Sequence, residues 1–265
     1  MNSTLITQKL GRLKMPGMTE TLDHRLEQAL TEKWSYSTLL EMLLTDEIER
    51  RNQKQLTLRL AKSRLDPQQT LETFNFDFNT TIQAPLIREL CSCGFIEKKQ
   101  NVFFVGQSGC GKSHLARALG HEACRRERDV LYYTTHQLLD WIHSGHGDGT
   151  HKRKLAQTIK TQILILDDFE LKSICENRQE DLYQIIAERY EQRSTIITSN
   201  RDVSEWSNIF ANPLLGTAAA DRLVHRGIKI AIKGPSYRLE EFKKTCEKTN
   251  KRVTIKEVKG KQKNE

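Results

Sequence analysis

The sequence has no uninterrupted apolar stretch long enough to cross a membrane, which argues against a transmembrane protein. Its first residues are polar and include Lys9, Arg12 and Lys14, so they lack the apolar core of a signal peptide. We therefore expect a cytoplasmic protein without a membrane partner.

The chain has only six cysteines and they are scattered, which disfavours both a zinc finger and a disulfide framework. Cys91 and Cys93 are separated by a single residue, a spacing that does not suit a zinc knuckle, and no second pair or nearby histidine completes one. We expect all the cysteines to be free thiols in a reducing compartment. They are Cys91, Cys93, Cys110, Cys124, Cys175 and Cys246.

Acidic residues are missing between Arg50 and Arg64, a segment that carries six basic ones. This segment belongs to residues 1–65, which we interpret as a small all-helical domain broken only at Pro16–Gly17, because apolar residues recur there at helical spacing. A basic helix flank is a candidate contact for double-stranded DNA. The alternative is that it is the solvent-exposed face of a helical bundle.

The rest of the chain alternates between short apolar runs and helical stretches, the pattern of an α/β protein. After a linker over 66–83 and a helix over 84–91, the predicted strands are 102–105, 130–134, 163–167, 195–199 and 228–232. Helices are predicted over 112–126, 136–143, 152–160, 178–192, 203–209 and 217–225. We expect a parallel five-stranded sheet with helices on both faces, in a domain that spans 84–242.

Residues 106–113 read Gly-Gln-Ser-Gly-Cys-Gly-Lys-Ser and directly follow the first predicted strand. This is the strand, glycine loop and helix start that binds the phosphates of a nucleoside triphosphate. The glycines let the backbone turn its N–H groups inward, Lys112 should reach the β- and γ-phosphates, and Ser113 should ligate Mg²⁺. The residues predicted to contact ATP are Gly106, Gln107, Ser108, Gly109, Cys110, Gly111, Lys112, Ser113 and His114.

Two adjacent carboxylates, Asp167 and Asp168, close the apolar strand 163–167 at the edge where open α/β sheets bind their ligands. We assign Asp167 to the Mg²⁺ shell through a water molecule. Asp168 is assigned to polarising the water that attacks the nucleotide. Consecutive side chains on a strand point to opposite faces, so the strand must bend at its end for both carboxylates to serve one site.

Polar and basic residues in the last third of the chain complete the predicted site. Asn200 follows a strand, where its amide can donate to the γ-phosphate or hold the water. Arg222 is our candidate for a finger that reaches the γ-phosphate bound by a neighbouring subunit, with Arg226 as its competitor. Arg238 can sense the γ-phosphate from its own subunit. The alternative for Arg222 is an ion pair with Asp221 on a solvated helix.

The net charge of +8 lies largely in residues 243–265, where nine Lys or Arg residues accompany three Glu. Such a basic tail suggests a polyanionic partner, of which nucleic acid is the commonest, or a solvated segment that aids solubility. The sequence contains no zinc finger and no clear helix-turn-helix motif, so we expect little base specificity.

Several motifs together resemble the IstB-like family, the ATP-binding helpers of insertion-sequence transposases. That family is related to the DnaC-type helicase loaders and the DnaA initiators within the AAA+ ATPases. The stretches that carry the resemblance are Leu13–Gly17, Thr70–Phe76, Gly106–Ser113, Ile165–Asp168, Thr198–Asn200, Asp221–Arg226 and Lys233–Arg238. The last two, with Glu205–Trp206, separate this family from other P-loop ATPases.

The resemblance implies a helical N-terminal domain, an AAA+ ATPase core with a reduced lid, and a homo-oligomer that assembles with ATP and DNA. It also implies delivery of target DNA to a partner transposase of the IstA type, a finger role for Arg222 and a sensor role for Arg238. Two alternatives remain open. One is a DnaC-type helicase loader, which shares every ATPase motif, and the other is a DNA-binding module that nucleotide only stabilises.

Overall fold

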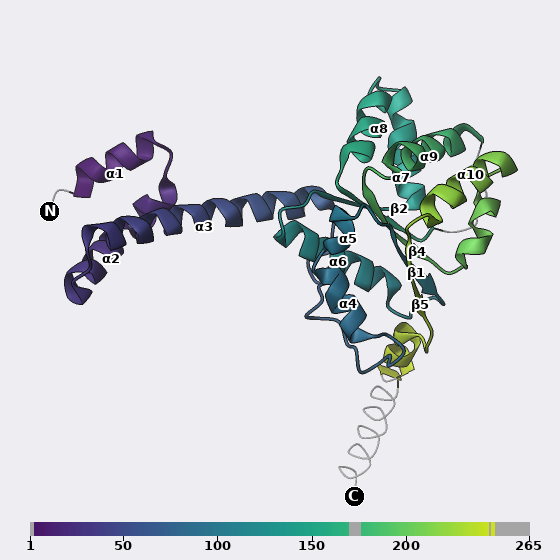
Figure 1. Cartoon of the computed structure of the whole chain (residues 1–265), viewed down its shortest axis with the longest axis horizontal. Coiled ribbons are helices and arrows are strands. Elements are labelled where there is room, and N and C mark those ends of the chain that lie inside the picture. Colours follow the sequence, from purple (N-terminus) through teal and green to yellow (C-terminus); the bar gives the residue numbers. More distant parts are fainter. Residues whose placement is uncertain (1–2, 170–175, 244, 247–265) are drawn as a thin grey trace, which may run out of the picture. The chain divides into compact units, whose positions relative to one another are not determined.

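The structure of the chain is a computed structural model, which describes residues 3–169, 176–243 and 245–246 (Figure 1). The chain divides into two compact units, Met1–Ala61 and Lys62–Glu265. The basic tail predicted over 243–265 lies almost entirely outside the described residues. In the part that is described, no helix is both long and apolar enough to cross a bilayer.

The first unit consists of helices α1 (Ser3–Arg12), α2 (Pro16–Glu32) and most of α3 (Tyr36–Ser63). The break predicted at Pro16–Gly17 is the start of α2, because proline suits the first turn of a helix. The division between the units falls inside α3, a few residues before the boundary at 65 that we expect from the sequence. The small buried core of this unit comprises Leu10, Met18, Leu22 and Leu43.

Gly17 marks the close approach of α2 to α3. A Cβ atom at this position would lie 2.7 Å from the Cα atom of Glu47, so only glycine fits. The Gly17 backbone N–H donates to Oε2 of the buried Glu47 over 2.6 Å, and Arg51 Nε donates to Oε1 over 2.6 Å. Burial alone would raise the pKa of Glu47, but these hydrogen bonds lower it below its ordinary value.

The second unit contains one sheet of five parallel strands in the order β2-β3-β4-β1-β5. This confirms the predicted α/β fold and its five predicted strands. The buried central strands β3 and β4 and the partly exposed edge strand β5 are typical of a parallel sheet covered on both faces. The strands are β1 (Val102–Gly106), β2 (Val130–Thr134), β3 (Ile163–Asp167), β4 (Ser194–Ser199) and β5 (Ile228–Ile232).

Helices cover both faces of this sheet (Figure 1). One face carries α4 (Ala84–Cys91), α5 (Gly94–Glu97) and α6 (Lys112–Arg125). The other carries α7 (Thr135–His143), α8 (His151–Lys160), α9 (Glu176–Arg189) and α10 (Pro213–Val224). Two 3₁₀ turns, η1 (Ser144–His146) and η2 (Val203–Ile209), connect these elements.

The start predicted for the helix over 217–225 was wrong, because α10 begins at Pro213. The Asn212 side chain accepts a hydrogen bond from the Leu214 backbone N–H over 2.9 Å, and proline occupies the first helical turn. Together these two residues start the helix one turn earlier than its apolar pattern suggests. The stretch 203–209 is helical as predicted, although it is a 3₁₀ helix.

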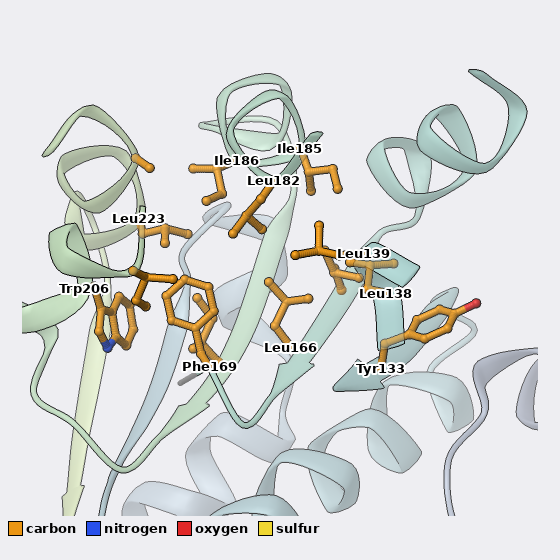
Figure 2. Packing of buried hydrophobic residues seen from close by; sticks show 14 of the residues in the cluster. Tyr133, Leu138, Leu139, Leu166, Phe169, Leu182, Ile185, Ile186, Trp206 and Leu223 are labelled. Atoms are coloured by element: carbon orange, nitrogen blue, oxygen red, sulfur yellow. The ribbon is translucent and has the colours of Figure 1, made fainter. Parts of the chain in front are cut away.

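The main apolar core lies between the sheet and helices α7, α9 and α10 (Figure 2). Leu164 and Leu166 of β3 belong to this core, whereas Ile165 faces the opposite side and packs on Gly120 of α6. Beyond the end of β3, Phe169 packs edge to face on Trp206, with ring centroids 5.0 Å apart. Tight packing on both faces therefore fixes the positions of the strand ends.

The described cysteines are free thiols, as predicted, and Cys175 lies outside the described residues. Four of them are buried and Cys246 is exposed.

Candidate active site

The predicted phosphate loop connects β1 to α6. Gly109 and Gly111 have φ values of +80° and +100°, which are left-handed conformations that favour glycine. Neither position has room for a side chain, because a Cβ atom would lie 2.1 Å from Ser236 Oγ at Gly109 and 2.9 Å from the Phe74 ring at Gly111. Gly109 and Gly111 are therefore required both by backbone conformation and by packing. Gly106 is required by packing alone, because a Cβ atom there would lie 2.0 Å from the Ile232 carbonyl oxygen.

Lys112, at the start of α6, lies at the centre of this loop. Its side chain is mostly covered, with the residue only 5% exposed. Its ammonium group donates to the Gln107 carbonyl over 2.8 Å and to Asn200 Oδ1 over 2.7 Å. Asn200 follows β4, so one hydrogen bond joins the phosphate loop to a second strand end. This brings together two residues that the sequence separates by 88 positions.

Asp167 ends β3 and is almost completely buried. Tyr132 Oη donates to its Oδ2 over 2.5 Å, Thr198 Oγ1 donates to its Oδ1, and Arg117 Nη2 lies 3.5 Å from Oδ2. These partners offset the cost of burying a carboxylate. Burial raises the pKa of Tyr132, and its hydrogen bond to Asp167 raises it further, so the phenol remains a proton donor.

Asp168 is exposed and has a φ of +50°, a left-handed conformation that is unusual for a residue other than glycine. Its backbone N–H donates to Thr198 Oγ1 over 3.0 Å, so Thr198 binds both acidic residues. Adjacent side chains of a straight strand point to opposite faces, so two neighbouring carboxylates can face one site only if the chain bends. The left-handed conformation of Asp168 provides this bend. Both Asp167 and Asp168 line the same cavity.

These groups surround a cavity of about 580 Å³ at the carboxyl ends of the strands. Its lining includes most of the predicted site, namely Ser108, Gly109, Cys110, Gly111, Lys112, Ser113, His114, Asp167, Asp168, Asn200 and Arg238. Gly106 and Gln107 begin the loop but do not line the cavity; Gln107 instead holds Lys112 through its carbonyl group. The oxygen donors of Ser113 and the two aspartates are hard ligands of the kind that suits Mg²⁺.

One wall of the cavity comes from the segment 66–83, which the sequence suggests only as a linker. His114 Nε2 is hydrogen bonded to the Thr70 carbonyl over 2.8 Å, and the Phe74 ring packs edge to face on His114 with centroids 5.1 Å apart. The sequence signals of this segment were the spacing of Leu71, Phe74, Phe76 and Phe78, which favours anchoring on the next domain, and the family motif Thr70–Phe76. The lining residues that sequence reasoning missed are Gln69, Thr73, Phe74, Asn75, Phe78, Asn79, Arg117, Tyr132, Thr134 and Tyr237.

Arg238 reaches the cavity because the chain after β5 returns to the phosphate loop. Residues 237–243 are helical, and the Tyr237 backbone N–H donates to the Gly109 carbonyl over 3.0 Å. The Tyr237 ring also packs edge to face on Phe78, with centroids 4.9 Å apart. The loop is thus held between the segment 66–83 and the C-terminal helical residues.

The two candidate finger arginines do not line the cavity of their own chain. Arg222 donates from Nη1 to the carbonyl of Ala218 in α10 over 3.0 Å, and its guanidinium lies 5.5 Å from the centroid of the Tyr183 ring. Arg226 is exposed, and its Nη2 lies 3.6 Å from Glu191 Oε1.

Comparison with known proteins places the chain in a family. Residues 8–245 match the family model described as IstB-like ATP binding protein. A protein of Geobacillus stearothermophilus, named as an ATP-binding protein of insertion sequence IS5376, is 36% identical over 87% of this chain and 92% of its own length. A Pseudomonas aeruginosa protein, named as an ATP-binding protein of insertion sequence IS21, is 36% identical over 89% of each chain.

Solved structures share the fold of a large part of this chain. DnaA from Aquifex aeolicus bound to AMPPCP superposes with a TM-score of 0.52 at 23% identity, over 71% of this chain and 57% of that chain. A DnaC helicase loader superposes with a TM-score of 0.50 at 24% identity, over 56% of this chain and 87% of the loader. With the family model covering almost the whole chain, we conclude that this protein belongs to the IstB-like ATP binding protein family and is an ATPase with the AAA+ fold.

Proposed function

We propose that the protein is an ATP-dependent switch that assembles on double-stranded DNA and delivers it to a partner transposase in the cytoplasm. The observation that carries the proposal is the convergence of the phosphate loop, Asn200 and the carboxylates of Asp167 and Asp168 on one cavity. The link to transposition rests on relatives named after insertion sequences, which match nearly the full chain at more than 30% identity.

In this proposal the cavity binds the triphosphate of ATP. Lys112 exchanges its bonds to Asn200 and Gln107 for the β- and γ-phosphates, and the released Asn200 amide holds the attacking water. Mg²⁺, when bound, neutralises phosphate charge. Ser113 would hold the ion directly and Asp167 through water, because the Asp167 oxygens already accept hydrogen bonds from Tyr132 and Thr198.

Asp168 is the better placed of the two acids to orient the attacking water. Its side chain is exposed to the cavity, whereas that of Asp167 is buried against protein donors. Its left-handed backbone aims it away from the strand direction. Arg238 contributes positive charge from the same chain, at a position that suits a γ-phosphate sensor.

We assign the trans finger to Arg222, with Arg226 as the competitor. In one chain neither arginine lines the cavity, so a finger role for either requires a neighbouring copy. Hydrolysis then depends on assembly, which would make ATP binding the signal to assemble and hydrolysis the signal to release.

Substitution of Lys112 by alanine tests the nucleotide site. We expect K112A to weaken binding of a fluorescent ATP analogue at least about 100-fold and to abolish ATP-dependent assembly in sedimentation, because the buried ammonium is the central cation of the loop. The matched control is K98A, an exposed lysine that does not line the cavity. Unchanged analogue binding by K112A would overturn the assignment of the cavity.

DNA binding is proposed for the basic flank of α3. Arg50 pairs with Glu20 and Arg51 with Glu47, whereas the side chains of Lys54 and Lys62 extend into solvent. We expect K54A/K62A to weaken binding to every duplex sequence and to lower the slope of log affinity against log salt by about 2. The control is R88A/K98A, which removes two exposed charges elsewhere. An equal loss in both double variants would remove α3 from the interface.

A helicase loader is the second candidate function, since the DnaC helicase loader shares the fold. That likeness extends over 56% of this chain at 24% identity, so it supports the fold alone. Co-purification with a two-domain transposase and, in parallel, with a replicative helicase distinguishes the candidates. Retention of the helicase without the transposase would favour the loader.

A further inference from the structure

Three potential metal ligands meet on the side of the sheet that carries α7, α8 and α9. His146 lies in η1, His151 begins α8, and Asp181 lies in α9. One ligand atom from each lies within 4.8 Å of the other two, and among the described residues they form the one such group of histidine, cysteine and acidic side chains. None of the three lines the nucleotide cavity.

The carboxylate and one imidazole are already in ligand-like positions. His151 Nε2 lies 2.9 Å from Asp181 Oδ1 and 3.1 Å from Oδ2, and the Asp181 residue is only 8% exposed. Ligands of a tetrahedral Zn²⁺ ion lie about 3.3 Å apart, given metal–ligand bonds of about 2.0–2.1 Å. An ion that replaces the proton between His151 and Asp181 would therefore require little movement of either side chain.

The backbone brings His146 to this pair. A Cβ atom at the buried Gly145 would lie 2.6 Å from the His151 backbone nitrogen, so η1 packs directly on the start of α8. Asp148 Oδ1 accepts a hydrogen bond from the Thr150 backbone N–H over 2.9 Å, which fixes the turn between them. The His146 and His151 rings are stacked, with centroids 3.9 Å apart.

His146 must rotate to become a ligand, because the lone pair of an imidazole lies in the plane of its ring. Its side chain is exposed, so solvent leaves room for that rotation. Beside it lies His143, whose Nδ1 is buried and has no hydrogen-bond partner among the described residues. A bound water molecule would supply such a partner for this nitrogen.

We propose that His146, His151 and Asp181 form a Zn²⁺-binding site that ties α8 and η1 to α9, separate from the Mg²⁺–ATP site. Two imidazoles and one carboxylate suit Zn²⁺, whereas Mg²⁺ prefers oxygen ligands alone. The alternative for the same geometry is a hydrogen bond between His151 and Asp181 with the His146 ring stacked on His151. The two alternatives predict different results: a Zn²⁺ site needs the His146 imidazole as a ligand, whereas the hydrogen-bonded pair binds no ion.

Two of the buried thiols, Cys91 and Cys93, are poor competitors for the ion. Burial raises the pKa of Cys91 to about 12 and that of Cys93 to about 11, so both remain protonated near neutral pH, and thiolates rather than thiols bind zinc. Cys246 is exposed, so every protein used in the test carries the substitution C246S.

The test is titration of the untagged full chain, stripped with a chelator and free of nucleotide, with Zn²⁺ by calorimetry and with Co²⁺ by visible absorption. We expect one ion per chain, a tetrahedral Co²⁺ spectrum, and a Tm about 5–10 °C higher at hundredfold excess of Zn²⁺ over Kd. H146Q and D181N should each weaken binding at least about tenfold. D181N retains a hydrogen-bond acceptor for His151, so loss of binding there reports the missing ligand charge.

H136Q is the matched control, because His136 is an exposed histidine of α7 away from the group. H146Q is the decisive variant, because an exposed side chain can be replaced without unfolding the protein. Retained binding of an ATP analogue by H146Q would confirm that the variant is folded. Zn²⁺ binding by H146Q equal to that of H136Q, or no saturable binding by the starting chain, would overturn the proposal.

Discussion

The nucleotide cavity and Arg222 of α10 differ in what a single chain provides. Around the cavity, residues of the phosphate loop, α6, β2, β3 and the C-terminal helical segment meet with Asn200, which follows β4. Hydrogen bonds such as that from Lys112 to Asn200 connect them. Arg222, by contrast, bonds to the backbone of its own helix and does not reach the cavity. Under the proposed function, one chain suffices to bind nucleotide, whereas hydrolysis needs a second copy that supplies Arg222.

The largest expected effect comes from R222A. Loss of a finger arginine should lower kcat about 10³-fold or more while leaving binding of an ATP analogue unchanged, because the guanidinium acts only on the transition state of a neighbour. Steady-state ATPase assays with DNA measure this. R226A is the matched control and should retain most of the activity.

A mixture of the K112A and R222A variants tests whether the finger acts on a neighbouring copy. K112A supplies an intact finger and R222A supplies an intact phosphate site, so their mixture should recover part of the ATPase activity that each lacks. No recovery, together with co-assembly of the two variants, would move the finger to a residue of the same chain.

The next effect concerns N200A. Removing the amide should lower kcat about 10²–10³-fold, the usual result of deleting one preorganised polar group at a reacting centre. Binding of the ATP analogue should change much less, since Lys112 still contributes its ammonium group to the phosphate loop. Single-turnover kinetics separates the two steps, and a loss confined to binding would make Asn200 a ground-state contact.

A third change probes stability far from the cavity. Arg189 is 2% exposed and donates to the carbonyls of Thr158, Thr161 and Ser194 near the start of β4. Burial lowers its pKa to about 9, which still leaves it charged at pH 7. R189M should leave these carbonyls without donors and lower the free energy of unfolding by about 3 kcal/mol. Urea denaturation measures this change. At urea concentrations below the unfolding transition, the affinity of the variant for an ATP analogue should be unchanged.

The smallest effect comes from the ion pair that ties the segment 66–83 to α6. The hydrogen bond from Arg125 lowers the pKa of Glu72 to about 2. The contribution of this pair is therefore present above the ordinary pKa of about 4.5 and is lost as the pH falls towards 2. Both side chains are exposed to solvent, so E72Q should cost only about 0.5 kcal/mol at pH 7. A loss that is larger at pH 3 than at pH 7 would contradict this sign.

Sequence patterns predicted the sheet and the loop well because their signals are local. Buried strands leave continuous apolar runs, and two glycines of the loop, Gly109 and Gly111, have left-handed φ values that favour glycine. The wall formed by 66–83 was missed because its contacts, such as Thr70 to His114, join residues 44 positions apart. The start of α10 was missed because a cap at Asn212, rather than an apolar periodicity, decides it.

The order of residues by itself determined the α/β fold, the phosphate loop and the acidic pair, since each depends on neighbours within a few positions. Only the tertiary structure decided that Asp167 is buried against Tyr132 and Thr198 while Asp168 turns outward, and that Arg222 stays away from its own cavity. The physical reason is that these outcomes depend on which strand ends and helices pack side by side. That packing is set by burial of the shared apolar core, which no short motif encodes.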